Sequence, residues 1–150
     1  MKFAAAVAIA ACLALTSCGA KQPTSRYAAA DARKDEIRGL WMQIRMWRAE
    51  MGLRGVEPTS RAIRQMLHVP MHQLLAELAA MCVPPTDPSH ACSDTCNLAE
   101  NICENAEAIC RIAGELRDDD WARRKCASAK ASCKDAKRQC CACESRHGRR

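Results

Sequence analysis

The sequence predicts an all-α protein, in which an N-terminal helical hairpin is followed by a C-terminal disulfide-stapled antiparallel helical hairpin. Two periodic patterns carry this prediction. Between residues 28 and 82, apolar residues recur at three- and four-residue steps, the period of one helix face. Between residues 91 and 144, cysteines recur at seven-residue steps in two separate runs. Aromatic residues make up only 3% of the 150 residues, so we expect a core of small side chains that needs covalent staples.

The first 17 residues have the composition of an export signal. A positive start at Lys2 is followed by an unbroken apolar run over residues 3–15. A run of this length is shorter than the ~20 residues that span a bilayer, so we expect a signal peptide over residues 1–17 and no permanent membrane span there.

The apolar run leads into residues 15–18 (LTSC), which resemble the lipobox of bacterial lipoproteins. The resemblance implies that Cys18 is diacylated on sulfur and becomes the first residue of the processed chain. Two or more acyl chains together anchor a protein stably, so the lipid bilayer is the first expected partner. In such lipoproteins an Asp after the cysteine retains the protein at the inner membrane, so Gly19 implies the outer membrane. Residues 18–27 then form a lipidated tether.

Residues 28–82 predict a helical hairpin whose second arm is split. The apolar face of the first helix ends at Gly52, and Pro58 opens the second arm. Pro70 interrupts that arm before its apolar face resumes. The apolar positions are Ile37, Leu40, Trp41, Ile44, Trp47, Met51, Ile63, Met66, Leu67, Leu74, Leu75, Leu78 and Met81. We expect the two tryptophans to be core residues and not a platform for a ligand.

Three prolines within residues 83–90 exclude a continuous helix and mark a linker before the Cys-rich segment 91–144. In that segment the cysteines form two rows of three, because a seven-residue step returns to nearly the same helix face. Alanines flank each row. The rows are Cys96, Cys103, Cys110 and Cys126, Cys133, Cys140, and the alanines are Ala99, Ala106, Ala113, Ala122, Ala129 and Ala136.

A turn near Asp118 brings both rows into one antiparallel register. Helices usually pack 8–10 Å apart, whereas a disulfide needs Cα atoms about 5.5–6 Å apart, so small residues between the bridges permit the approach. Export to an oxidising compartment makes disulfides the expected state. The register predicts the pairs Cys96–Cys140, Cys103–Cys133, Cys110–Cys126 and Cys92–Cys143. It leaves Cys82 and Cys141 as a weaker fifth pair, because Cys141 and Cys143 could exchange partners.

Charge favours the same pairing. Acidic residues prevail over residues 92–116 and basic residues over 121–143, so the two helices attract each other weakly. The acids at 118–120 suit the N-terminus of the second helix, and we prefer this capping role to a calcium site.

The functional prediction is a non-enzymatic envelope lipoprotein that acts as a structural or interaction module. No G-x-S-x-G, H-E-x-x-H or glycine-rich phosphate loop is present, so we expect no catalytic residues, no enzyme and no cofactor. An envelope protein or an anionic surface is the expected further partner, and we expect no nucleic acid. The basic tail 145–150 could contact anionic headgroups or remain solvated.

The alternative is soft-metal binding. Stacked thiol rows resemble the cysteine-lined helical bundles that store cuprous copper, since soft thiolates select Cu(I). The alanine layers and the absence of a twin-arginine signal favour disulfides instead, so we assign no metal site. His68 and His72 have the i,i+4 spacing of a helical metal site, but Pro70 lies between them, and we expect surface histidines.

The C-terminal pattern, from residues 91–96 (ACSDTC) to 140–143 (CCAC), resembles Cys-rich modules of uncharacterised bacterial lipoproteins. The likeness covers about a third of the chain and implies no activity.

Overall fold

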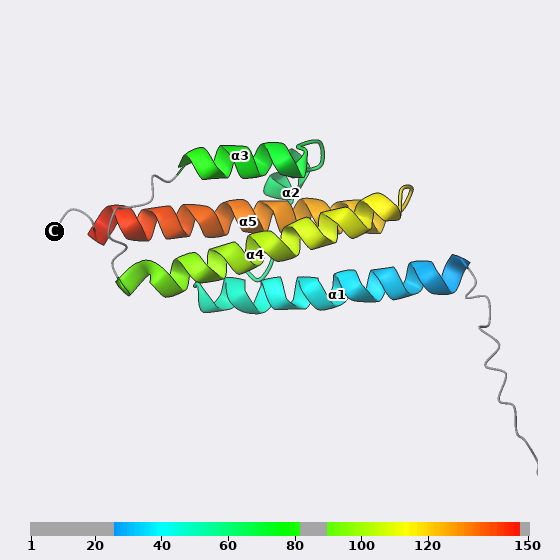
Figure 1. The fold of residues 1–150 in the computed structure, drawn as a ribbon, viewed down its shortest axis with the longest axis horizontal. Coiled ribbons are helices and arrows are strands. Elements are labelled where there is room, and N and C mark those ends of the chain that lie inside the picture. The colour runs from blue at the N-terminus through cyan, green and yellow to red at the C-terminus, as the bar shows by residue number, and fades with distance from the viewer. Residues whose placement is uncertain (1–25, 82–89, 148–150) are drawn as a thin grey trace, which may run out of the picture.

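The computed structural model describes residues 26–81 and 90–147, which form five helices and no strand (Figure 1). The helices are α1 (Arg26–Glu50), α2 (Ser60–Met66), α3 (Met71–Met81), α4 (His90–Glu115) and α5 (Asp120–His147). The predicted all-α fold is confirmed. The predicted signal, Cys18 and most of the tether and of the proline-rich linker lie outside the described residues.

Helices α4 and α5 form the predicted antiparallel hairpin, with its turn over residues 116–119. The Asp119 backbone N–H donates to the Leu116 carbonyl at 2.8 Å, which closes the turn. The Asp119 carboxylate accepts from the Ala122 N–H at 2.9 Å and lies 2.6 Å from Lys34 Nζ of α1. Asp119 therefore starts α5 as its N-cap and also ties the turn to α1.

We expect Asp119→Ala to cost about 1 kcal/mol of unfolding free energy, the usual effect of losing an N-cap. The bonds from Lys34 and from the Ala122 N–H hold the pKa of Asp119 below its usual range. Because this pKa is lowered, the ionised Asp119 carboxylate contributes its full stabilisation when the pH is above the unfolded-state pKa of about 3.9. The contribution is lost as the pH falls through the folded-state pKa. Melting curves of wild type and Asp119→Ala should therefore converge between about pH 5 and pH 2.

The control for this experiment is Asp118→Ala, since Asp118 is exposed in the same turn. Its melting temperature should follow that of wild type throughout. An Asp119→Ala deficit that stays constant down to pH 2 would contradict the capping role.

Helix α5 is the centre of the fold, because all four other helices pack on it. Its middle is buried on every side, which explains why this stretch is rich in Ala and Ser. The Ser132 hydroxyl donates to the Ser128 carbonyl, and the Ser128 hydroxyl donates to the Arg124 carbonyl, both at 3.0 Å. The consecutive buried residues are Ala127, Ser128, Ala129, Lys130, Ala131, Ser132 and Cys133.

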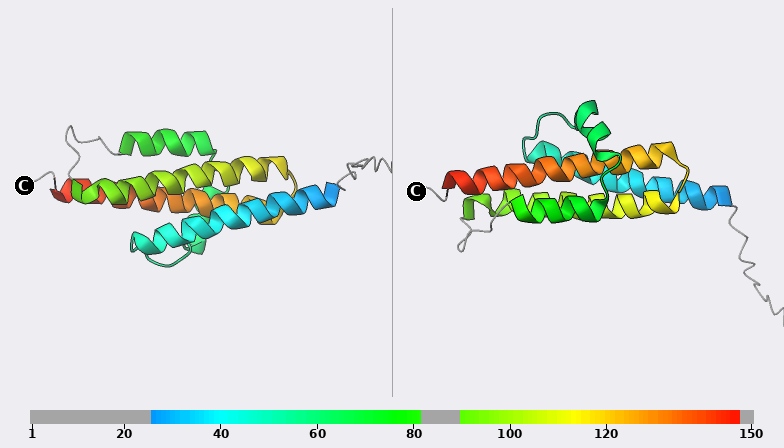
Figure 2. Two further views of the ribbon diagram at one scale, coloured as in Figure 1. Left: turned by 60° about the horizontal axis from the view of Figure 1, so that its bottom comes forward. Right: turned by 90° about the horizontal axis from the view of Figure 1, so that it is seen from above.

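The N-terminal segment wraps the Cys-rich hairpin. The chain turns between α1 and α2 with Gly52 and Gly55 at positive φ, and Pro70 separates α2 from α3, as predicted. However, α1 and α3 lie on opposite sides of the α4–α5 pair and do not pack chiefly on each other (Figures 1 and 2). The apolar faces of the N-terminal helices meet the hairpin, so both segments share one core.

Most predicted apolar positions belong to this core, but two do not. Ile37, Ile44 and Leu74 are fully buried, whereas Leu67 is 41% exposed and Met81 is 40% exposed. Leu67 directly follows α2, and Met81 is the last residue of α3.

Candidate functional site

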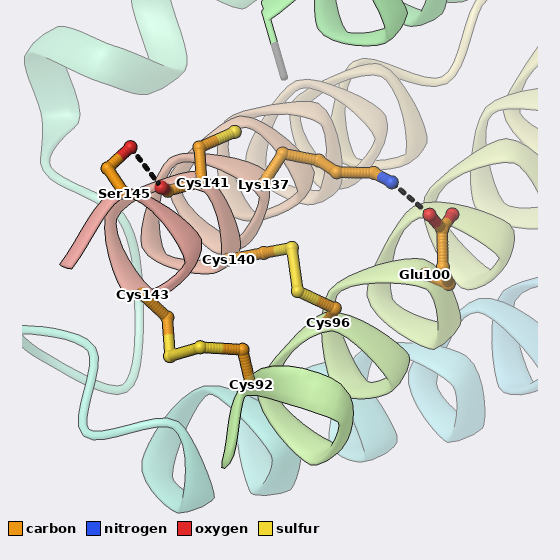
Figure 3. Close-up of a disulfide and its surroundings, with 8 residues drawn as sticks. All are labelled: Cys92, Cys96, Glu100, Lys137, Cys140, Cys141, Cys143 and Ser145. Carbon is orange, nitrogen blue, oxygen red and sulfur yellow. Dashed lines mark hydrogen bonds and ion pairs between the residues drawn. A yellow bond between two sulfur atoms is a disulfide. The ribbon is translucent and has the colours of Figure 1, made fainter. Parts of the chain in front are cut away.

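The most distinctive site is a ladder of four disulfides between α4 and α5. These are the four pairs that the antiparallel register predicts. The Cα–Cα distances are 5.8 Å for Cys92–Cys143, 4.8 Å for Cys96–Cys140, 4.7 Å for Cys103–Cys133 and 4.6 Å for Cys110–Cys126. Figure 3 shows the two bridges at the end of the ladder away from the turn, with Lys137 of α5 paired to Glu100 of α4 beside them.

Alanine layers separate the bridges. All six alanines of the two rows are buried, and none is more than 5% exposed. Helix axes usually lie 8–10 Å apart. At three of the bridges the Cα atoms of α4 and α5 are less than 5 Å apart, so only methyl groups fit between the two helices. The small residues are therefore a geometric requirement of the ladder.

Cys141 is also disulfide-bonded. Its side chain projects from the other side of α5 than the neighbouring bridges, and its carbonyl accepts from the Ser145 hydroxyl at 2.8 Å (Figure 3). Cys143 pairs with Cys92, as the register predicts, and not Cys141, which the sequence had left as the other possible partner. Cys82 lies outside the described residues, so its pairing with Cys141 stays a prediction.

Bridged cysteines are not the thiolates that Cu(I) binds, so soft-metal binding would require the reduced chain. Within residues 26–81 and 90–147, no group of three or more His, Cys, Asp or Glu side chains could hold a metal ion. His68 and His72 are both exposed on either side of Pro70. Asp119, one of the three acids weighed as a calcium site, caps the N-terminus of α5.

Two cations are almost completely buried, and they differ in their partners. The Arg48 side chain of α1 is 1% exposed and lies 3.3 Å from both an Asp135 carboxylate oxygen and the Gly55 carbonyl. Lys130 of α5 is 5% exposed, and its ammonium donates to the Val69 carbonyl at 2.6 Å. Burial lowers the pKa of Lys130. Lys130 is one of the bases of residues 121–143, and its burial was not predicted from the sequence.

Two grooves meet at Lys130 and the Cys110–Cys126 bridge. The first, of about 580 Å³, opens beside the turn of the hairpin, and the second, of about 790 Å³, opens between α3 and α4. The segment between α2 and α3 lines both and is tied to α5 by the Lys130–Val69 hydrogen bond. The first groove is lined by Leu67, His68, Cys110, Ala113, Gly114, Arg117, Asp120, Arg123, Arg124, Cys126 and Lys130.

The outer face of α1 carries an exposed stripe at alternating three- and four-residue steps. Its largest members are Met42, 52% exposed, and Met46, 60% exposed. The opposite face of the same helix carries Ile37 and Ile44 into the core, so the stripe points away from the hairpin. The stripe consists of Ala32, Asp35, Gly39, Met42, Met46 and Ala49, all exposed. Apart from one acid, these residues are apolar or small.

The two tryptophans of α1 serve the core, as predicted. Trp41 is 4% exposed, with Lys125 Nζ 4.7 Å from its ring centroid, and Trp47 packs at the core's edge. None of the helices in the described parts of the chain is both long and apolar enough to cross a membrane.

The ladder and the helices around it define a class: a small, cysteine-rich, all-α protein built on a covalently stapled hairpin. The chain matches no protein-family model, no curated protein and no solved structure.

Proposed function

We propose that the chain is a non-enzymatic envelope lipoprotein, a rigid interaction module held at the outer membrane through acylated Cys18. The observation that carries the proposal is the ladder, which links α4 and α5 covalently from one end to the other. Such cross-links restrict the unfolded chain and favour one fixed shape. A fixed shape suits a module that presents a surface to partners in an oxidising compartment.

The outer face of α1 is the proposed contact surface, and an envelope protein is the proposed partner. The stripe has the spacing with which one helix packs against another. Its exposed methionines are flexible and polarisable, properties that recur at protein-binding surfaces. Helix α1 begins only eight residues after Cys18, and eight residues span at most about 30 Å when extended. An anchor at Cys18 would therefore hold this face near the membrane.

We expect an envelope protein to be cross-linked through this face in cells. A photoreactive residue at position 39, which belongs to the same exposed stripe one turn before Met42, should give a covalent adduct between this chain and its partner, with one defined mass. The double substitution Met42→Glu and Met46→Glu should abolish the adduct, because two carboxylates would have to be buried in the contact. Mass spectrometry of the purified adduct would identify the partner.

The matched control is Val56→Glu, which introduces the same charge at an exposed apolar residue in the loop after α1. The adduct should survive this change. An adduct that persists in the double methionine variant would place the contact surface elsewhere on the protein.

The anchor is tested separately by Cys18→Ser. We expect this variant to accumulate as an unprocessed, unacylated precursor, whereas the wild-type protein should begin at residue 18 and carry the mass of its acyl chains. Intact-protein mass spectrometry that finds wild-type cleavage at another residue, with no lipid on Cys18, would refute the anchor.

A further inference from the structure

The contrast between the two buried cations identifies a position where a negative charge is missing. Arg48 faces the Asp135 carboxylate, whereas within residues 26–81 and 90–147 Lys130 donates to a neutral acceptor, the Val69 carbonyl, and belongs to no ion pair. An ammonium group carries three N–H donors and a full charge, and burying it without a counter-charge is costly. The remaining donors of Lys130 are therefore available to an anion that enters from the adjoining space.

The groove beside the turn supplies such an entrance, and the charged side chains that line it are predominantly cationic. Arg117, Arg123, Arg124 and Lys130 line it against one carboxylate, that of Asp120. Asp120 is already paired with Arg123. Arg117 and Arg124 are exposed, and neither belongs to an ion pair within the described residues.

We propose that the groove at the turn end of the hairpin binds a small phosphate-bearing anion, with Lys130 at its base and Arg117 and Arg124 at its rim. Guanidinium groups bind phosphate oxygens through paired, charge-assisted hydrogen bonds, and a lysine adds a compact point charge. The groove volume of about 580 Å³ lies in the range of small-ligand pockets, about 300–1,000 Å³.

The groove also has an apolar side, which limits the class of ligand. Leu67, Ala113 and the Cys110–Cys126 bridge line it together with the basic groups. A phosphate attached to a short organic group would fill both parts. Both a free phosphate compound and the headgroup of a phospholipid have this chemistry. The site does not depend on the anchor at Cys18 or on the outer face of α1, so it can be tested independently of both.

The experiment titrates the full chain, purified in a zwitterionic detergent, with inorganic phosphate and with glycerophosphoglycerol, a soluble phospholipid headgroup. Sodium chloride holds the ionic strength constant, so that general screening does not change. We expect saturable binding by calorimetry with one equivalent per chain. Lys130→Met should weaken it at least about tenfold, the effect of losing one charge-assisted hydrogen bond.

Lys134→Met is the matched control, since Lys134 lies one turn further along α5 and does not line the groove. It should bind as wild type does. Because Lys130→Met also removes the bond to Val69, Arg124→Gln provides a second test at an exposed residue that cannot affect the core. It should weaken binding with an unchanged circular dichroism spectrum.

The two ligands distinguish the sources of the phosphate. Tighter binding of glycerophosphoglycerol would indicate a phospholipid headgroup, and tighter binding of inorganic phosphate would indicate a free compound. No saturable binding of either ligand would overturn the proposal. Binding that Lys130→Met and Arg124→Gln leave intact would also overturn it, because the anion would then bind elsewhere.

Discussion

Replacing Ala129 with Leu should prevent the hairpin from closing its ladder. Ala129 is fully buried between the Cys103–Cys133 and Cys110–Cys126 bridges, whose Cα–Cα distances are 4.7 and 4.6 Å. A leucine there must push α5 away from α4, beyond the reach of a disulfide. Overpacking alone costs about 1–3 kcal/mol. Each bridge that fails to form removes about 2–4 kcal/mol more. We therefore expect free thiols and a much lower melting temperature.

The matched control is Ala142→Leu, on the same helix but exposed. It adds the same volume and apolar area without entering the seam. Its thiol count and melting temperature should equal those of wild type. An Ala129→Leu protein that oxidises with the wild-type linkages would show that the small residues are not needed for bridging.

Reduction of the whole ladder should have the second large effect. The innermost bridge joins residues 16 apart, and closing a loop of this size stabilises a fold by about 3 kcal/mol in the chain-entropy model. The outer bridges are nested around it, so each adds less than it would alone. A small core offers little to offset the loss. The reduced full chain should therefore melt at a far lower temperature and with less cooperativity than the oxidised chain.

Circular dichroism with and without a phosphine reductant measures this difference. The double variant Cys103→Ser, Cys133→Ser serves as an intermediate, because it lacks one bridge and keeps the others. Its melting temperature should lie between those of the oxidised and reduced wild type. Equal melting temperatures for oxidised and reduced wild type would show that packing alone maintains the hairpin.

The hairpin could be predicted because its signals are local and repeat. The seven-residue steps define one face on each helix, and only one register aligns the cysteines and alanines of both. The acids near residue 118 mark the turn, and the structure shows that Asp119 caps the second helix. Each of these signals can be read without knowing what else covers the hairpin.

The arrangement around the hairpin could not be predicted in the same way. Periodicity shows that α1 and α3 each have an apolar face, but not which surface covers it. The sequence of α4 does indicate one such surface, because the buried residues Ile102 and Ile109 directly precede Cys103 and Cys110. This second apolar face of α4 needs a partner other than α5, and α1 packs on α4.

Lys130 and the groove beside it illustrate a second limit. A lysine on a helix rich in basic residues is normally exposed. Here, helices from distant parts of the chain enclose α5, and the run of Ala and Ser from residue 127 to 132 is the sequence signal of that enclosure. Because Lys130 interrupts this run, its burial could have been inferred only together with the burial of its neighbours.

The ladder itself is tested most directly by mapping disulfides in protein taken from the cell envelope without reductant. Digestion at acidic pH after Lys, Arg and Glu places Cys103 in residues 101–104 (NICE) and Cys133 in residues 131–134 (ASCK). These two peptides should travel as one linked species. Likewise, residues 108–111 (AICR) should be linked to 126–130 (CASAK).

The same sample should contain at most one or two free thiols among the ten cysteines after Cys18. The ladder predicts both linked species and this low count. Unlinked peptides with nearly all ten thiols free, and cuprous copper retained through gel filtration, would contradict it, because one cysteine cannot be both bridged and a thiolate ligand.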